Sequence, residues 1–312
     1  MKTKRNLDFV GNLKKFVIVS AVLLLIGIVC TAVFGPVLDI NFAGGTKISY
    51  SYTGKLDTDK VAKLAGDTVG KKVSADITSG VSDSSHKLVI SLSDNEALDS
   101  STIDSLAKAL KEGYADNKIE QIEVNSVSPT VGAVFFIKCL VAVVIACLLV
   151  IIYVAIRFRK IGGVSAAIAA LIALLHDVLL AFFAAVILRL NIDSNFIAVV
   201  MTLLGYSLND TIVVFDRVRE NRRHYGQTKS IAEITNISNN QVLSRNIMTS
   251  LTTVIAIVTI MVVAEIKGLT SLRTLTIPLT VGLLSGTYSS VCISPGLWVK
   301  WQERKARKAA KD

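Results

Sequence analysis

Long apolar segments alternate with short, strongly charged ones along this chain of 312 residues. Uncharged apolar runs of about 20 residues are typical of helices that cross a lipid bilayer. A polar region, 35–132, separates the first run from the second, whereas short connections join most of the later runs. The pattern predicts a polytopic α-helical membrane protein with six transmembrane helices, at about 16–34, 133–156, 163–187, 195–215, 247–264 and 274–297.

The first apolar run resembles a secretory signal peptide, because it follows a basic start. Its apolar core extends from Phe16 to Phe34 and is therefore about 19 residues long. The corresponding region of a signal peptide has about 7–15 residues. No A-x-A cleavage site follows the run. We therefore expect an uncleaved transmembrane helix.

The polar region 35–132 combines strand-like and helix-like periodicity. Alternating apolar and polar residues indicate strands, whereas apolar residues three to four positions apart indicate amphipathic helices. The predicted order is β-α-β-β-α-β, which matches the ferredoxin-like split βαβ motif. We expect a Ser- and Asp-rich turn between the second and third strands, at 80–85. The expected strands are 39–53, 71–79, 86–93 and 119–127, and the expected helices are 57–70 and 100–114.

The positions of the charged residues along the chain indicate how the protein is oriented in the membrane. The net charge of +10 suggests nucleic-acid binding, but most Lys and Arg residues flank apolar runs, which is typical of a membrane protein oriented by its cytoplasmic charge. We therefore expect no nucleic-acid partner. Two terminal tails and two connections carry 20 Lys and Arg residues, whereas the short loops on the opposite side carry three. This asymmetry predicts that both termini are cytoplasmic and that 35–132 is an extracytoplasmic domain. The basic segments are 1–15, 157–162, 216–246 and 298–312.

Small residues within the apolar runs indicate packing rather than chemistry. Every cysteine lies in an apolar run, so the sequence predicts neither a disulfide framework nor a zinc site. A Gly-x-x-x-Gly spacing in the last run predicts close packing of helices. We expect no bound metal and no cofactor. These residues are Cys30, Cys139, Cys147, Cys292, Gly282 and Gly286.

Asp210 is the most informative polar residue of the apolar runs. An ionised side chain at the centre of a membrane helix costs about 2.5–3.5 kcal/mol on insertion scales. Asp210 precedes Asp216, where the charged edge begins, by six residues, or about 9 Å of helix. Ser207 lies on the same helix face, and Asn209 is an adjacent polar residue. The sequence favours an ion-binding carboxylate, and the alternative is a polar contact that only holds helices together.

Arg245 is the expected partner of Asp210. It stands where the fifth run begins, at about the same depth as Asp210. A carboxylate beside a cation keeps its charge, whereas a carboxylate in apolar surroundings holds a proton. An aspartate that alternates between these environments can take up and release a proton. Thr249 and Ser250 could hold water or the guanidinium, and the alternative is that Arg245 is an ordinary basic flank.

His176 and Asp177 form a second polar site, in the third run. Counted from Gly163, Asp177 lies about 21 Å along the helix, which places it in the outer half of the membrane. About 12 Å of depth would separate it from Asp210, so a shared proton path would need bridging water. The alternative is a structural aspartate that is bonded to neighbouring helices. A metal-binding role for His176 is disfavoured, because no cluster of ligands accompanies it.

Several segments resemble the SecF family of bacterial protein-export membrane proteins. GYSLNDTIVVFDRVREN at 205–221 is similar to the family's fourth-helix signature. FAGGT at 42–46, HDV at 176–178 and SRNIMTS at 244–250 agree with the same family. The resemblance covers nearly the whole chain and implies half of a resistance-nodulation-division type transporter. Two positions depart from the family pattern, because Ser128-Pro129 replaces a Gly-Pro pair and Ser244 replaces the histidine that often precedes the arginine.

The resemblance implies a role in protein export at the bacterial plasma membrane. Members of the family work with SecD and use the entry of protons, or of sodium ions in some organisms, to drive late steps of export through the SecYEG channel. It implies that Asp210 is the ion-path carboxylate and Arg245 the fifth-helix arginine, and that the partner carboxylate lies in SecD. Other implied partners are YajC, the translocating unfolded polypeptide and membrane lipid. The expected ion pathway comprises Asp210, Arg245, Asn209, Ser207, Asp177 and Thr249.

Two other classes of function remain as alternatives. Small-molecule or lipid exporters of the resistance-nodulation-division superfamily usually carry two six-helix halves in one chain, whereas this chain has one half. A membrane enzyme is disfavoured because the sequence has no GxSxG motif, no metal-ligand set and no Walker lysine. We therefore expect a non-enzymatic, ion-coupled subunit.

Overall fold

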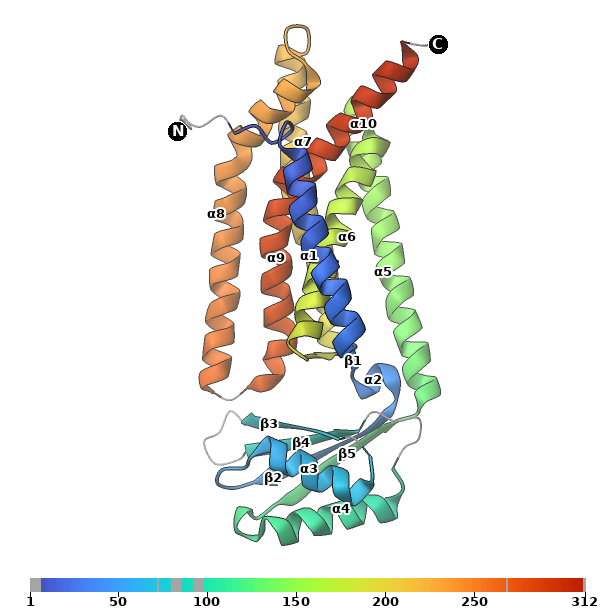
Figure 1. Ribbon diagram of the computed structural model, residues 1–312, viewed down its shortest axis with the longest axis vertical. Helices are drawn as coiled ribbons and strands as arrows, with labels where there is room; N and C mark the ends of the chain where they lie inside the picture. The colour runs from blue at the N-terminus through green and yellow to red at the C-terminus, as the bar shows by residue number, and fades with distance from the viewer. Residues whose placement is uncertain (1–6, 72, 80–85, 93–97, 268, 311–312) are drawn as a thin grey trace.

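The computed structural model describes residues 7–71, 73–79, 86–92, 98–267 and 269–310. A bundle of long helices carries a small α+β domain at one end, and both chain termini lie at the other end (Figure 1). Six helical stretches of the described chain are long and apolar enough to cross a membrane. The expectation of a mainly helical protein with six apolar helices and a small sheet region is therefore confirmed. The stretches are α1 (Leu13–Phe34), α5 (Pro129–Arg157), α6 (Gly163–Ile187), α7 (Ser194–Tyr225), α8 (Ile231–Ile266) and the pair α9 (Arg273–Cys292) and α10 (Ser294–Ala309).

Two helices extend well beyond the apolar runs that predict them. Helix α7 has 32 residues and α8 has 36. The fifth run was expected to start at 247, but α8 already begins at Ile231. Its start is fixed by a capping box, in which Ser230 and Glu233 satisfy each other's backbone N–H groups. Hydropathy misses this part of α8 because its residues are polar.

The last apolar run forms two helices instead of one. The expected span 274–297 breaks at Ile293, which joins α9 to α10. Pro295 lies in the first turn of α10, where its missing N–H costs no helical hydrogen bond. A proline at this position cannot continue α9, so the chain changes direction there.

The first expected strand, 39–53, is wrong in its first part. The structure has a short strand β1 (Val37–Leu38), one helical turn α2 (Ile40–Ala43) and then β2 (Gly45–Tyr52). Asp39 starts α2, because its Oδ1 accepts the backbone N–H of Asn41 at 3.0 Å. The alternation of apolar residues therefore predicts the strand correctly only from Gly45 onward.

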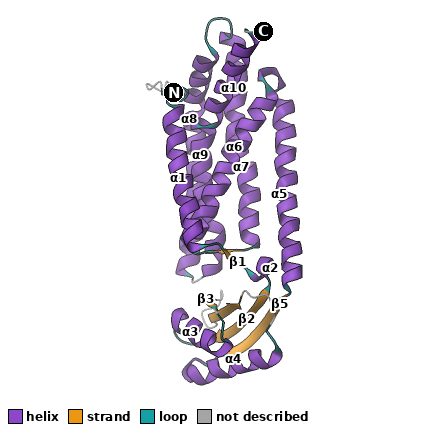
Figure 2. Ribbon diagram, turned by 45° about the vertical axis from the view of Figure 1, so that its right-hand side comes forward, coloured by secondary structure: helices purple, strands orange, loops and turns teal. Residues whose placement is uncertain are grey.

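Strand β2 and three later strands form one antiparallel sheet with two helices on one face. The order across the sheet is β3-β4-β2-β5, and every neighbouring pair is antiparallel. Helices α3 and α4 lie on the face away from the bundle (Figure 2). They bury Val61, Leu106 and Leu110 against Ile48 and Leu88 of the sheet. The turn expected at 80–85 lies outside the described residues. The bounds are α3 Thr58–Val69, β3 Ser74–Ser79, β4 His86–Leu92, α4 Ser100–Gly113 and β5 Glu120–Val127.

The α+β domain meets the bundle through tight backbone contacts. Gly44, which ends α2, has φ +83°, a conformation that essentially only glycine adopts. A Cβ atom at Gly44 would lie 2.6 Å from the Cα atom of Pro129, the first residue of α5. β1 also pairs in parallel with β6 (Asn191–Ile192), which lies between α6 and α7. The domain is therefore fixed to three different helices of the bundle.

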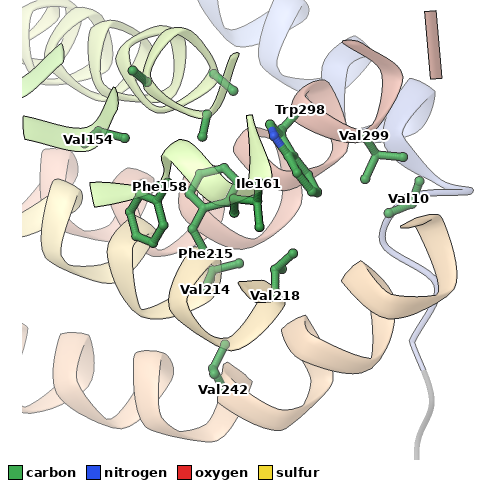
Figure 3. Packing of buried hydrophobic residues seen from close by; sticks show 13 residues of the cluster. Val10, Val154, Phe158, Ile161, Val214, Phe215, Val218, Val242, Trp298 and Val299 are labelled. Atoms are coloured by element: carbon green, nitrogen blue, oxygen red, sulfur yellow. The ribbon is translucent and has the colours of Figure 1, made fainter. Parts of the chain in front are cut away.

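A large apolar cluster holds the opposite end of the bundle together. The rings of Phe158 and Trp298 each lie 5.7 Å from the ring of Phe215, measured between centroids. All three side chains are fully buried, and Figure 3 shows them between the ends of several helices. Because Phe215 belongs to α7, this cluster fixes the part of α7 that follows Asp210 and lies toward the chain termini. The labelled members of the cluster are Val10, Val154, Phe158, Ile161, Val214, Phe215, Val218, Val242, Trp298 and Val299.

Candidate functional site

One face of α7 carries both apolar packing residues and buried polar residues. Leu203, Ser207, Asp210 and Val214 follow each other at spacings of four, three and four residues, and all are buried. Such spacing places them on one stripe of the helix. The stripe faces α6, α8 and α9 because α7 packs against all three. The apolar members anchor α7, and the two polar members must find partners within the bundle.

Asp210 receives its polar contacts from α8. Its side chain is only 2% exposed. The hydroxyl of Ser250 donates to Asp210 Oδ2 at 3.3 Å, and the Asn246 amide Nδ2 donates to the Asp210 backbone oxygen at 3.5 Å. The sequence drew attention to Ser250 but not to Asn246. The two donors are four residues apart on α8, so they share one helix face.

Arg245 lies near Asp210 but does not form an ion pair with it. Asn246 is the residue of α8 that faces Asp210, and Arg245, its neighbour, is turned by about 100° around the helix. Arg245 is exposed and lines a groove between α7 and α8. The expectation of equal depth agrees with these positions, whereas a direct contact between guanidinium and carboxylate is absent from this conformation.

The groove beside Arg245 has a volume of about 610 Å³ and a strongly charged lining. Asp216 lies between two guanidinium groups, at 2.9 Å from Arg157 and 2.8 Å from Arg219. Among the described residues, no carboxylate pairs with Arg223 or Arg245. The groove therefore presents unpaired positive charge next to the end of α7 that carries Asp216. Its lining consists of Val213, Asp216, Arg217, Arg219, Glu220, Arg223, Gln241, Val242 and Arg245.

Asp177 is the centre of a second buried polar cluster. It is fully buried, and both of its oxygens accept hydrogen bonds from serines. Oδ2 accepts from Ser207 at 2.7 Å and from Ser289 at 2.8 Å, and Oδ1 accepts from Ser285 at 2.6 Å. The hydroxyls come from α7 and α9, so the cluster joins three helices. This is the arrangement expected of a structural aspartate, and it also holds a carboxylate in a defined position.

The structure changes the expected role of Ser207. The sequence grouped Ser207 with Asp210 because they share a helix face, but the hydroxyl of Ser207 donates to Asp177. Ser207 and Asp210 are three residues apart, or about 4.5 Å along α7. Side chains lean toward the N-terminus of their own helix, so the carboxylates of the antiparallel helices α6 and α7 lean toward each other.

The other expected pathway residues lie further from the carboxylates. Asn209 is exposed, because it is turned by about 100° around α7 from the buried Asp210. Thr249 donates its hydroxyl to the Arg245 backbone oxygen at 2.9 Å, within its own helix. His176 is buried, and its Nδ1 lies 3.2 Å from both Asp177 Oδ1 and Ser285 Oγ. Within the described part of the chain, no group of three His, Cys, Asp or Glu residues could hold a metal ion.

Sequence reasoning missed Ser285 and Ser289, although a signal was present. The two serines are four residues apart in the last apolar run, so they share one helix face. Gly286 lies between them and allows close approach, because a Cβ atom there would be 3.2 Å from Ser207 Oγ. Gly282 likewise faces Leu203, whose Cδ1 would lie 2.3 Å from an added Cβ. The expectation that these glycines serve packing agrees with the contacts.

Replacing Asp177 with Ala should strongly destabilise the bundle. Three serine hydroxyls and the imidazole of His176 would lose their common acceptor. A buried donor that is left without its acceptor costs about 1–3 kcal/mol, so Asp177→Ala, which affects several donors, should cost more than Ser285→Ala, which removes one. Thermal unfolding of the detergent-solubilised proteins would measure both. Equal melting temperatures for Asp177→Ala and the unmodified protein would show that the cluster does not stabilise the fold.

Comparisons with known proteins show the family to which this chain belongs. The family model described as "Protein export membrane protein SecD/SecF, C-terminal" matches residues 106–304. The protein translocase subunit SecF of Alicyclobacillus acidocaldarius is 31% identical over 311 residues, which cover 99% of this chain and 97% of the relative. The protein translocase subunit SecDF of Bacillus subtilis is 37% identical over 307 residues, which cover 96% of this chain but 39% of the relative.

A solved structure shows the same fold. The crystal structure of SecDF from Thermus thermophilus, described as a translocon-associated membrane protein, superposes with a TM-score of 0.79 at 26% identity. The match covers 97% of this chain and 40% of that chain. Six apolar helices and these relatives identify a multi-pass membrane protein and a protein translocase subunit. The chain therefore belongs to the SecF branch of the SecD/SecF family of protein-export membrane proteins.

Proposed function

We propose that this subunit, together with a SecD-type partner, couples the movement of protons or sodium ions across the bacterial plasma membrane to late steps of protein export. The observation that carries the proposal is Asp210, a carboxylate that is 2% exposed in the middle of an apolar helix. Intramembrane carboxylates mark ion pathways because burying them serves no apolar packing. The hydrogen bond from Ser250 holds this carboxylate in place without neutralising it.

The proposed ion path follows α7. The groove beside Arg245 leads from water to Val213, which lies one turn from Asp210. From Asp210, a further turn leads to Ser207, whose hydroxyl contacts Asp177. Movement of Arg245 toward Asp210 would stabilise a charged carboxylate, and its withdrawal into the groove would favour a carboxylate with a bound proton. Alternation between these positions would bind and release one cation per cycle.

The proposed orientation places both termini in the cytoplasm and the α+β domain outside. The excess of Lys and Arg at the terminal end of the bundle supports it. The strand order β3-β4-β2-β5 with two crossover helices supports a ferredoxin-like fold for the domain between the first two of six transmembrane helices. In this position the domain can meet an unfolded polypeptide that leaves the membrane channel.

A SecD-type partner follows from the lengths of the relatives. This chain spans 39% of the Bacillus subtilis SecDF and 40% of the Thermus thermophilus SecDF. We propose that a separate subunit supplies the remaining part, including the second carboxylate of the ion path. SecYEG, YajC, the exported polypeptide and membrane lipid are the other proposed partners. A non-enzymatic role without a cofactor, in which H⁺ or Na⁺ is the transported ion, is part of the same proposal. The alternative is one half of a small-molecule or lipid exporter of the same superfamily.

Export into vesicles tests the coupling. We expect that vesicles containing this subunit, its SecD-type partner and the SecYEG channel lose late-stage export when one ion gradient is collapsed. A protonophore and a sodium ionophore, applied separately, would identify the ion. Export that persists after both treatments would exclude ion coupling. Transport of a small molecule or a lipid in the same vesicles, without any effect on polypeptides, would favour the exporter.

A further inference from the structure

Asn246 has a side chain that packing alone does not explain. It is 1% exposed and lies on the face of α8 that meets Asp210. Its Nδ2 donates to the Asp210 backbone oxygen at 3.5 Å, whereas its Oδ1 is buried and has no hydrogen-bond partner in the described chain. Buried acceptors nearly always have a partner in folded proteins. The unpaired oxygen of Asn246, on a side chain that contacts Asp210, is therefore available to a ligand of that carboxylate.

The orientation of this amide follows from its neighbour. A backbone carbonyl can only accept a hydrogen bond, so the NH₂ group of Asn246 must face the Asp210 oxygen. Turning the amide over would place two acceptors against each other. The side-chain oxygen of Asn246 is therefore directed away from the Asp210 carbonyl, as an acceptor.

Three different oxygens gather where α7 meets α8. Asp210 contributes a carboxylate, Ser250 a hydroxyl at 3.3 Å from Asp210 Oδ2, and Asn246 an amide oxygen. Asn246 and Ser250 are four residues apart and present these groups on one face of α8. Carboxylate, amide and hydroxyl oxygens are ligands for hard cations.

The groove gives this place access to water. Val213 and Val242 line the groove. Val213 follows Asp210 by three residues, and Val242 precedes Asn246 by four, so each stands one helical turn from one residue of the oxygen cluster. A cation that leaves the oxygen cluster toward this side would pass Arg245, whose positive charge favours its release into the water of the groove.

We propose that Asn246 is a ligand of the ion site, and that its side-chain oxygen receives the transported monovalent cation, Na⁺ or hydrated H⁺, beside the Asp210 carboxylate and the Ser250 hydroxyl. This inference rests on the proposed function, because it assumes that Asp210 binds the ion. It assigns a role to a residue that carries no charge. The amide oxygen orients the ion, and the carboxylate supplies the charge that holds it.

The same helix provides a matched control. Asn239 is also fully buried, its Nδ2 donates to the Val291 backbone oxygen at 3.0 Å, and its Oδ1 also lacks a partner in the described chain. The difference is the residue that each amide contacts, because Asn239 bonds to Val291 of α9, whereas Asn246 bonds to Asp210. A purely structural role of a buried asparagine on α8 would therefore affect Asn239 and Asn246 equally, whereas an ion-binding role would affect only Asn246.

The test compares Asn246→Leu with Asn239→Leu in vesicles that hold the full complex. The export rate is measured against Na⁺ concentration at constant pH, and against pH in the absence of Na⁺. We expect that Asn246→Leu raises the half-saturating concentration of the transported ion by at least about 10–100-fold, because that is the effect of losing a residue that only orients a metal ligand. Asn239→Leu should leave this concentration unchanged, whatever it does to the amount of protein. A change in the Na⁺ series identifies Na⁺ as the transported ion, and a change in the pH series identifies H⁺.

Further variants keep the outcome decisive. If either Leu variant is not recovered in the complex, Asn246→Ser and Asn239→Ser are compared in the same way, because serine is small and polar. Unchanged half-saturation for the Asn246 variants, or an equal shift for the Asn239 variants, would overturn the inference. Asp210→Asn is measured beside them. If it is inactive while the Asn246 variants are normal, only the role of Asn246 fails, and if it is fully active, the proposed function fails too.

Discussion

Replacing Asp210 with Asn should abolish ion-coupled export while the protein remains folded in the membrane and bound to its SecD-type partner. The two side chains have nearly the same shape, and the amide oxygen of Asn can still accept the hydrogen bond that Ser250 donates to Asp210. The amide cannot take up a proton and cannot hold a cation through a net charge. Loss of activity with normal packing is therefore the expected result.

The experiment is complementation of a strain that is depleted of its own SecF-type subunit. Secretion of a reporter is measured for each variant, together with the amount of subunit in the membrane and its recovery with the partner. Asp216→Asn is the matched control, because it is on the same helix, six residues away, and pairs with Arg157 and Arg219. These partly exposed ion pairs contribute about 0–1 kcal/mol each, so the control should secrete normally. Full rescue by Asp210→Asn would exclude Asp210 as the ion-binding group.

The apolar runs predicted the helices of the bundle because few backbone conformations are stable in a bilayer. Backbone groups in a membrane must be satisfied internally, so an apolar run of sufficient length becomes a helix. The run 163–187 coincides with α6. Hydropathy misjudged α8, because the polar turns from Ile231 to the membrane surface lie beyond the apolar run. Their helical start depends on the capping of Ser230, which is a local and specific interaction.

The candidate site was predicted in part, and the missing part has a physical reason. Asp210 and Asp177 stand out in the sequence because a charge within an apolar run is costly. Neutral residues such as Ser289 and Asn246 cost much less and therefore give a weaker signal. Their roles depend on which helix lies opposite, and only the packing of α7 against α8 and α9 determines that. The assignment of Ser207 to Asp210 instead of Asp177 failed for the same reason.

The two buried carboxylates differ in the number of hydrogen bonds that hold them in place. Asp177 accepts hydrogen bonds from three serine hydroxyls and is fully buried, which are the properties of a fixed structural residue. Asp210 has one side-chain donor, Ser250, and adjoins a groove. A site that must bind and release an ion on every cycle cannot be satisfied by permanent partners. The sparse contacts of Asp210 therefore fit the moving ion better than those of Asp177.

Replacing Arg245 with Ala should also eliminate ion-coupled export, whereas Arg245→Lys should retain part of it. Arg245 has no carboxylate partner among the described residues and lines the groove that adjoins Asp210. A mobile cation at this place can approach Asp210 and withdraw, which the proposed cycle requires. Lys keeps the charge but lacks the planar group that can hold two hydrogen bonds to a carboxylate, so we expect a reduced rate instead of none.

Arg223→Ala is the matched control for Arg245, because Arg223 lines the same groove and likewise has no carboxylate partner in the described chain. Secretion by the depleted strain is measured for the three variants at equal amounts of membrane-inserted subunit. If the groove needed only its total positive charge, Arg223→Ala and Arg245→Ala would reduce secretion equally. If Arg245 acts on Asp210, only the Arg245 variants lose export. Normal secretion by Arg245→Ala would remove the guanidinium from the cycle and leave Asp210 to exchange its ion with water in the groove directly.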